Sequence, residues 1–343
     1  MLAARLTGPK HLEIVETDTP DPDGHNVIIR VKTCGICGSD LHYWETGLDM
    51  TGKTGLIMGH EFCGTVVDPG SRSDLRPGDR VTALPLDPCG TCGPCRRGQA
   101  NLCTKGMKRS IPGNNSPGAF AQYLKLRHDM VRILPDTISE SEAAMIEPAS
   151  VALHAVHQAG LGIGDRVFIT GGGTIGLLCA AWARTGGASY IALSEINEGR
   201  REFARALSYV DAVFDAADPG VVSTMKKAIK GSFDIAIDTS GRDAGINTAI
   251  SALKSQGRLV LAGINFHPQS IFTLMLVIKE IEMKASLGYI PEEFDLALES
   301  IADKTLHVGN LINKTIPLKD VQKSFENLAS GDTCDVKIIL EVT

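Results

Sequence analysis

The 343-residue sequence has no basic excess, no long apolar run and no internal repeat. It holds 34 lysine and arginine residues against 40 aspartate and glutamate residues, which gives a formal net charge of −6. No block of basic residues supplies the positive patch that nucleic-acid binding needs, so we expect no nucleic-acid partner. Apolar stretches such as Ile271–Ile278 end well before the roughly 20 residues of a membrane-spanning helix, so we expect no membrane association.

The first residues also lack the apolar core of a signal peptide, because Arg5, Pro9 and Lys10 follow Met1 too closely. We therefore expect a cytoplasmic protein. Disulfides are rare in that reducing compartment, so the 9 cysteines are better interpreted as metal ligands or catalytic groups.

What the sequence does contain is an ordinary globular composition, with 43% hydrophobic and 22% charged residues. The length predicts roughly two domains of about 150 residues each. From about residue 25 to 135, short β-rich runs such as Asn26–Val31 and Phe62–Val67 are separated by glycine- and proline-rich turns. From about residue 149, apolar runs alternate with helical patterns, which is typical of βαβ units and a parallel sheet.

The second region predicts an α/β domain with a doubly wound parallel sheet over residues 149–287. After about residue 288 the chain is expected to rejoin the first domain. Asp218 is the predicted N-cap of one helix, with Pro219 as its first residue. The predicted strands are 166–170, 190–194, 233–238 and 258–262, with a weaker pair near 212–214 and 281–287, and the predicted helices are 174–185, 197–207, 219–229 and 243–253.

A glycine motif, G-x-G-x-x-G, follows the predicted strand 166–170 and opens a helix. Glycines allow the tight turn and the close approach of a pyrophosphate, which the helix N-terminus favours. Glu195 ends the next strand and is placed to accept hydrogen bonds from the adenosine ribose, so NAD is favoured over NADP. Arg200 and Arg201 leave NADP open, because either could reach a 2′-phosphate. The candidate cofactor residues are Gly171, Gly173, Thr174, Ile175, Gly176, Glu195 and Arg200.

Four cysteines, Cys89, Cys92, Cys95 and Cys103, have the spacing C-x2-C-x2-C-x7-C in a lobe of about residues 86–105. Four thiolates on glycine-rich backbone match the tetrahedral sulfur coordination of a closed, structural zinc site. An iron–sulfur cluster is the lesser alternative.

Three further elements carry the ligand types of an open zinc site: Cys37 with the adjoining Ser39, Asp40 and His42, then His60-Glu61, then Glu147-Pro148. A buried cysteine or a capping histidine would explain any one of these elements alone.

Taken together, these elements and the glycine motif resemble the zinc-containing medium-chain alcohol dehydrogenases, in particular the polyol branch of sorbitol, butanediol and related dehydrogenases. The motifs occur in the family's order and cover essentially the whole chain. The resemblance implies a GroES-like β-rich catalytic domain over residues 1–148 and 288–343 and a Rossmann NAD-binding domain over residues 149–287. It also implies a homodimer or homotetramer.

The resemblance further implies that Cys37, His60 and a glutamate hold a catalytic zinc. Glu147 is the favoured third ligand, and Glu61 is an alternative ligand or inner-shell partner. Asp40 would orient a ligand.

The implied reaction is hydride transfer from a secondary alcohol to NAD, giving the ketone. Ser39 would contact the substrate oxygen and pass its proton, through the nicotinamide ribose, to His42. The expected substrates are a polyol, sugar alcohol, sugar phosphate or vicinal diol. A threonine-type amino alcohol and a primary alcohol remain alternatives, as does a non-enzymatic NAD sensor with architectural zinc.

Overall fold

The computed structural model describes residues 1–331 and 333–342, and of residue 107 the backbone alone. The chain divides into two units. The first comprises Met1–Glu147, Ile290–Lys304 and Val308–Thr343, and the second comprises Pro148–Tyr289 and Thr305–His307.

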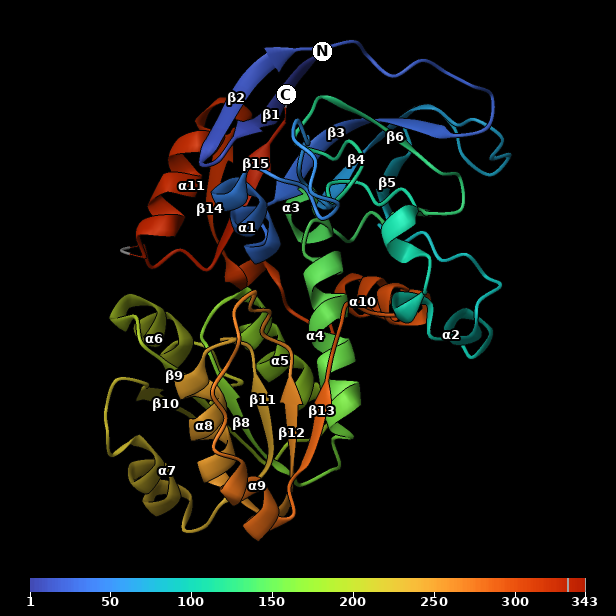
Figure 1. Ribbon diagram of the computed structural model, residues 1–343. Helices are drawn as coiled ribbons and strands as arrows, with labels where there is room; N and C mark the ends of the chain where they lie inside the picture. Colours follow the sequence, from blue (N-terminus) through green and yellow to red (C-terminus); the bar gives the residue numbers. More distant parts are fainter. Residues whose placement is uncertain (332, 343) are drawn as a thin grey trace. The chain divides into compact units, whose positions relative to one another are not determined.

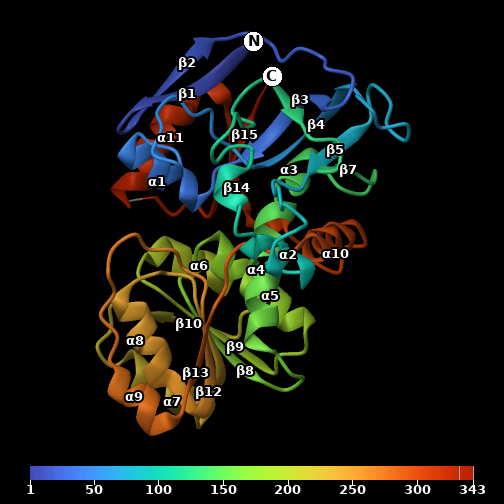
Figure 2. The same ribbon diagram turned by 45° about the vertical axis from the view of Figure 1, so that its right-hand side comes forward.

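The second unit is built on a parallel six-stranded sheet with the strand order β10-β9-β8-β11-β12-β13. That order is doubly wound, because the chain changes direction across the sheet between β8 and β11. Figure 2 shows α7, α8 and α9 on one side of the sheet and α4 and α5 on the other. The elements are α4 (Ile146–Ala159, which starts at the end of the first unit), β8 (Arg166–Thr170), α5 (Thr174–Thr185), β9 (Tyr190–Glu195), α6 (Glu198–Arg205), β10 (Ala212–Asp215), α7 (Val221–Ile229), β11 (Phe233–Asp238), α8 (Asp243–Ala252), β12 (Leu253–Leu261), α9 (Thr273–Lys279) and β13 (Glu282–Ala285).

The strands of this sheet are apolar because helices cover both of its faces. Val167, Phe168 and Ile169 of β8 are fully buried, as are Ile235 and Ala236 of β11. The predicted α/β class with a parallel sheet is confirmed. β12 begins five residues earlier than predicted, at Leu253 rather than at residue 258, since Leu253 itself pairs with Phe233 of β11.

The predicted start of α7 is wrong. The helix begins at Val221 with Gly220 as its N-cap, not at Pro219 after Asp218. The side chain of Asp218 accepts a hydrogen bond from the backbone N–H of Gly220 at 2.8 Å, so residues 218–220 form a turn that delays the helix.

The first unit holds a mostly antiparallel sheet with the order β14-β15-β3-β4-β5-β7, and β6 also pairs with β3. A separate hairpin joins β1 and β2. The last strand, β15, lies beside β3 although they are far apart in the sequence (Figure 1). The elements are β1 (Leu2–Gly8), β2 (His11–Glu16), β3 (Val27–Gly35), α1 (Gly38–Thr46), β4 (Glu61–Asp68), β5 (Arg80–Ala83), α2 (Gly93–Arg96), the 3-10 turns η1 (Ala100–Leu102) and η2 (Gly106–Lys108), β6 (Tyr123–Leu126), β7 (Val131–Ile133), α3 (Glu140–Ala143), α10 (Pro291–Ala302), η3 (Gly309–Leu311), β14 (Ile312–Pro317), η4 (Leu318–Asp320), α11 (Val321–Ser330) and β15 (Lys337–Glu341).

Alternating side chains of β3 anchor this sheet in the core of the first unit. Val27, Ile29 and Val31 are fully buried and pack in one apolar cluster with Phe120 and Phe325. Burying each such side chain contributes about 1.5–3 kcal/mol. The carboxyl end of β3 is therefore held rigidly, and the residues of the candidate site follow directly after it.

Candidate active site

Three candidate zinc ligands meet where β3 ends and β4 begins. Gly35, the last residue of β3, pairs with Glu61, the first residue of β4. Cys37 follows Gly35 in the turn before α1, and His60 directly precedes β4. The ligand atoms of Cys37, His60 and Glu61 all lie within 4.8 Å of one another. A thiolate, an imidazole and a carboxylate at this spacing suit a zinc ion.

Asp40, on α1, lies against two of these residues. Its Oδ2 atom accepts a hydrogen bond from the backbone N–H of Cys37 at 2.9 Å, and its Oδ1 atom lies 3.7 Å from Nδ1 of His60. Metal-bound histidines commonly face a carboxylate with their second ring nitrogen in this way. Asp40 therefore holds the backbone of Cys37 by a hydrogen bond and places a carboxylate oxygen beside the imidazole of His60.

Burial and charge shift the pKa values of this pair. Burial raises the pKa of Asp40 to about 6, and the nearby His60 opposes that rise. Burial lowers the pKa of His60, but the negative charges of Asp40 and Cys37 outweigh it and raise that pKa well above its ordinary value. The charges around His60 thus favour its protonated form when no metal is bound.

Glu61 forms a buried ion pair that the sequence analysis missed. Its Oε2 atom pairs with Nζ of Lys337, and the two side chains are only 2% and 1% exposed. Burial lowers the pKa of Lys337, but Glu61 and Cys37 outweigh it and raise that pKa above its ordinary value. The available signal was a single lysine in the otherwise apolar run Val336–Leu340, which forms most of β15.

Glu147, the favoured third ligand, lies at the start of α4 and is half-buried. Its charge helps to raise the pKa of His60, so it is near enough to act on that side chain. Among the described residues, however, the close group of donor atoms contains Glu61 and not Glu147.

Ser39 and His42, the predicted proton path, lie on α1 next to Cys37. Residues three apart on a helix share a face, and both side chains are partly exposed. Tyr43 and Trp44, the next residues on α1, are buried in the core of the first unit.

The four cysteines of the lobe also bring their sulfur atoms close together. The sulfur atoms of Cys89, Cys92, Cys95 and Cys103 lie within 4.8 Å of one another, and none of these cysteines is in a disulfide. Backbone N–H groups point at the sulfurs, as from Cys92 to Cys89 Sγ at 3.4 Å. A hydrogen bond from Thr91 is the main cause that lowers the pKa of Cys89 to about 5, which favours the thiolate that metals bind.

The glycine motif turns tightly between β8 and α5. Gly171 has a φ of +98°, and a side chain on Gly176 would collide with the carbonyl of Gly171. The carboxylate of Glu195 accepts hydrogen bonds from the backbone N–H groups of Gly172 and Asn197, at 2.7 and 2.8 Å. Glu195 therefore lies against the turn, as a ribose-binding carboxylate would.

The two arginines near Glu195, Arg200 and Arg201, differ in their burial and in their hydrogen bonds. Arg201 is buried and donates to the carbonyls of Glu195 and Ile196 and to Asp215. Arg200 lies beside it on α6, partly exposed, and its backbone N–H is capped by Asn197. Arg201 is thus committed within the fold, and Arg200 is the more exposed of the two.

Asp238, at the end of β11, is a further residue that the sequence analysis missed. It is fully buried and accepts hydrogen bonds from the hydroxyls of Thr170 and Ser240 and from the backbone N–H of Gly241. The neighbouring Thr239 donates to the carbonyl of Thr170. These bonds tie the loop after β11 to the glycine turn.

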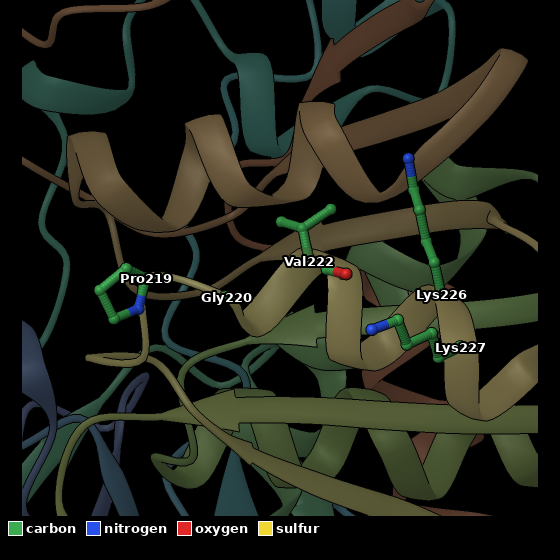
Figure 3. Close-up of a pocket in the computed structure, with 6 residues that line it drawn as sticks. Pro219, Gly220, Val222, Lys226 and Lys227 are labelled. Atoms are coloured by element: carbon green, nitrogen blue, oxygen red, sulfur yellow. The ribbon is translucent and has the colours of Figure 1, made fainter.

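One pocket of about 610 Å³ lies at the start of α7, and none of the site residues above lines it (Figure 3). It is lined by Pro219, Gly220, Val222, Ser223, Lys226 and Lys227. These side chains include no thiol, imidazole or carboxylate, so the pocket has no donor set for zinc.

Comparison with known sequences decides the family. Residues 23–136 match the family described as "Alcohol dehydrogenase GroES-like domain", and residues 174–303 match "Zinc-binding dehydrogenase". D-xylulose reductase A of Aspergillus niger is 34% identical over 325 residues, which are 92% of this chain and 90% of that relative. The chain belongs to the zinc-containing alcohol dehydrogenase family.

Solved structures of this family share the fold along the whole chain. L-idonate 5-dehydrogenase from Escherichia coli has a TM-score of 0.89 and 28% identity, over 99% of this chain and 97% of that one. A zinc-binding dehydrogenase of Sinorhizobium meliloti, bound to NADP, has a TM-score of 0.90 and 27% identity, over 99% and 98% of the two chains.

The resemblance inferred from the sequence motifs is thereby confirmed, together with the GroES-like and Rossmann fold classes and the assignment as an alcohol-oxidising dehydrogenase. In the described part of the chain, no helix has the length and apolar character needed to cross a membrane.

Proposed function

We propose that this dehydrogenase oxidises a secondary alcohol of a polyol, sugar alcohol, sugar phosphate or vicinal diol to the ketone, with NAD as the hydride acceptor. The observation that carries the proposal is the convergence of Cys37, His60 and Glu61 beside Ser39 in the first unit. The names of the related proteins, D-xylulose reductase and L-idonate 5-dehydrogenase, support a polyhydroxylated substrate.

Cys37, His60 and a glutamate would hold the catalytic zinc. When bound, the zinc acts as a Lewis acid that acidifies the alcohol. Asp40 would orient the ligands, since one carboxylate oxygen accepts a hydrogen bond from the backbone N–H of Cys37 and the other faces His60. Glu61 supplies the carboxylate in the close donor group, which supports it as a ligand, and Glu147, the third ligand favoured by the family resemblance, would be the other.

Ser39 and His42 would remove the proton. The hydroxyl of Ser39 would accept the proton of the alcohol as it gives up its own, and the imidazole of His42, which is partly exposed, would receive a proton and release it to water. NAD, when bound, would supply the acceptor for the hydride that leaves the carbinol carbon. The products are the ketone, NADH and one proton.

The glycine turn would hold the pyrophosphate of NAD through Gly171, Gly173, Thr174, Ile175 and Gly176. The negative charge of Glu195 beside this turn disfavours the 2′-phosphate of NADP. Because a family relative binds NADP, Arg200 remains the residue that would accommodate that phosphate.

Cys89, Cys92, Cys95 and Cys103 would hold a second, structural zinc. Four sulfur ligands complete a tetrahedral shell and leave no position for a substrate, so this ion would stabilise the lobe without taking part in the reaction.

We further assign the catalytic domain to residues 1–148 and 288–343 and the NAD-binding domain to residues 149–287. The division of the structure after Glu147 and after Tyr289 supports this assignment. A homodimer or homotetramer is supported by the exposed apolar side chains near the sheet edge at β13, since 53–73% of Leu274, Val277 and Ile278 is accessible.

To test the proposal, the zinc-loaded protein is incubated with NAD or NADP and each member of a panel of polyols, vicinal diols, sugar phosphates, threonine and primary alcohols. Reduction of the cofactor is measured from the absorbance of the reduced nicotinamide. We expect turnover with NAD and a polyhydroxylated secondary alcohol. Turnover confined to threonine or to primary alcohols would show that the proposed substrate class is wrong. No turnover with any alcohol, despite full zinc occupancy, would contradict the proposal.

A further inference from the structure

The guanidinium of Arg201 is buried at the carboxyl end of β9. Arg201 lies on α6, which packs against β9 and β10, and only 9% of the residue is exposed. Its Nη1 atom donates hydrogen bonds to the carbonyls of Glu195 and Ile196 at 3.1 and 2.6 Å. The same atom donates to Oδ1 of Asp215, the last residue of β10, at 3.2 Å. A single buried cation therefore joins the ends of two neighbouring strands.

These bonds complete the support of Glu195. Its carboxylate accepts hydrogen bonds from the backbone N–H groups of Gly172 and Asn197. Its carbonyl accepts from Arg201 and from the backbone N–H of Ala216, which lies 3.1 Å away. A hydrogen bond from an ionised donor is roughly twice as strong as one between neutral groups. Arg201 thus helps to fix the residue that we propose for the adenosine ribose.

The charges at this edge of the sheet are also paired. Asp215 is the register partner of Glu195, so two carboxylates end adjacent strands. In dinucleotide-binding domains a carboxylate favours the ribose hydroxyls of NAD, whereas a nearby arginine accommodates the 2′-phosphate of NADP. Here Nη1 of Arg201 is occupied by two carbonyls and by Asp215, whose charge offsets that of the guanidinium.

We propose that Arg201 and Asp215 are a positioning pair that holds Glu195 toward the adenosine ribose and sets the preference for NAD over NADP. Arg201 fixes the backbone of Glu195. Asp215 holds the guanidinium inward and offsets its charge, so that the arginine is withheld from a 2′-phosphate. The inference rests on the proposed binding of the cofactor at the glycine turn and extends it to two residues that act through position and charge.

The test measures the Kd of NADH and of NADPH by nicotinamide fluorescence in the absence of alcohol, so it requires no turnover. In Arg201→Met, Glu195 is held less firmly and the two carboxylates lose their counter-charge. We expect the Kd of NADH to rise about 10-fold, and that of NADPH to rise by a larger factor, because like charges repel its phosphate. At saturating NAD, kcat should stay within about 2-fold, since only cofactor binding is weakened.

Asp215→Asn is the second variant, and it decides the question if Arg201→Met fails to fold. It preserves the shape of a side chain that is 43% exposed, so little stability is at risk. The charge of Arg201 is then no longer offset, and the Kd of NADPH should fall about 3-fold while that of NADH stays within about 2-fold. The ratio of the two Kd values should therefore move in opposite directions in the two variants. An unchanged ratio in Asp215→Asn would overturn the inference, and so would equal changes for both cofactors in Arg201→Met.

Arg205→Met is the matched control, because Arg205 is an exposed arginine one helical turn further along α6. Both Kd values should stay unchanged. An effect as large as that of Arg201→Met would overturn the inference, since any positive charge on α6 would then suffice. If the intact protein binds neither NADH nor NADPH, the cofactor assignment of the proposed function fails and the inference fails with it. Binding by the intact protein without the selective effects above overturns the inference alone.

Discussion

The two candidate metal sites of this dehydrogenase are built in opposite ways. The lobe takes all four sulfurs from the single segment Cys89–Cys103, partly exposed and with backbone N–H groups directed at the thiolates. The candidate catalytic site takes its donors from two strand ends, buries His60 and Glu61 but leaves Cys37 partly exposed, and has Asp40 and Lys337 as charged neighbours. A structural ion needs only a closed shell, whereas a catalytic ion needs an open position held by a wider set of charges.

The largest effect is expected at Cys37. Cys37→Ser removes a zinc ligand from the buried site and should lower kcat/KM by about three orders of magnitude or more, because Lewis-acid assistance contributes several kcal/mol to the transition state. Metal analysis should show the loss of the catalytic zinc alone.

Cys34→Ala is the matched control, since Cys34 is a fully buried thiol three residues earlier that is not in the donor group. It should keep both zinc ions and most of the activity. Equal zinc loss in the two variants would contradict the assignment of Cys37 as a zinc ligand.

A smaller effect is expected at His42. His42→Ala should lower kcat by about 100-fold at neutral pH, because the group that passes the proton to water is removed. The pH profile of kcat should change shape, and small buffer bases should partly restore the rate.

His11→Ala, on the exposed strand β2, is the control for loss of an imidazole. An unchanged pH profile in His42→Ala would remove this residue from the proton path.

A substitution at Gly173 should weaken cofactor binding without unfolding the protein. A β-carbon there has no neighbour within 4 Å, so Gly173→Ala should fold normally. The added methyl group would stand where the pyrophosphate approaches, and KM for NAD should rise about 10-fold. Gly176→Ala, whose β-carbon meets the carbonyl of Gly171, should instead lower the melting temperature.

The smallest effect on chemistry is expected in the lobe. Cys103→Ser should release the structural zinc and lower the melting temperature by on the order of 10 °C, because several kcal/mol of folding free energy are lost. At low temperature kcat should stay within about 2-fold of the original. A loss of activity as large as that of Cys37→Ser would contradict the assignment of a purely structural role to the lobe.

The same contrast explains what the sequence could and could not predict. The lobe and the glycine turn are local, so spacing alone located Cys89–Cys103 and Gly171–Gly176. The buried strands β8 and β11 were also predictable, because a strand covered on both faces is a continuous apolar run.

Longer-range partners were not predictable in this way. Lys337 is distant from Glu61 in the sequence, and only the pairing of β15 with β3 brings them together. The start of α7 was missed because the side chain of Asp218 bonds within its own turn instead of capping a helix that starts at Pro219. Whether Glu61 or Glu147 completes the zinc shell depends on side-chain directions that spacing does not encode.

The most direct test of the central claim is a zinc titration of the metal-depleted dehydrogenase, with NADH formation from a polyol substrate measured at each step. We predict that activity rises only as the site at Cys37 and His60 fills, and that Cys37→Ser takes up zinc in the lobe yet stays inactive. Full activity with the lobe alone occupied, or turnover by Cys37→Ser at the rate of the unaltered protein, would contradict the account.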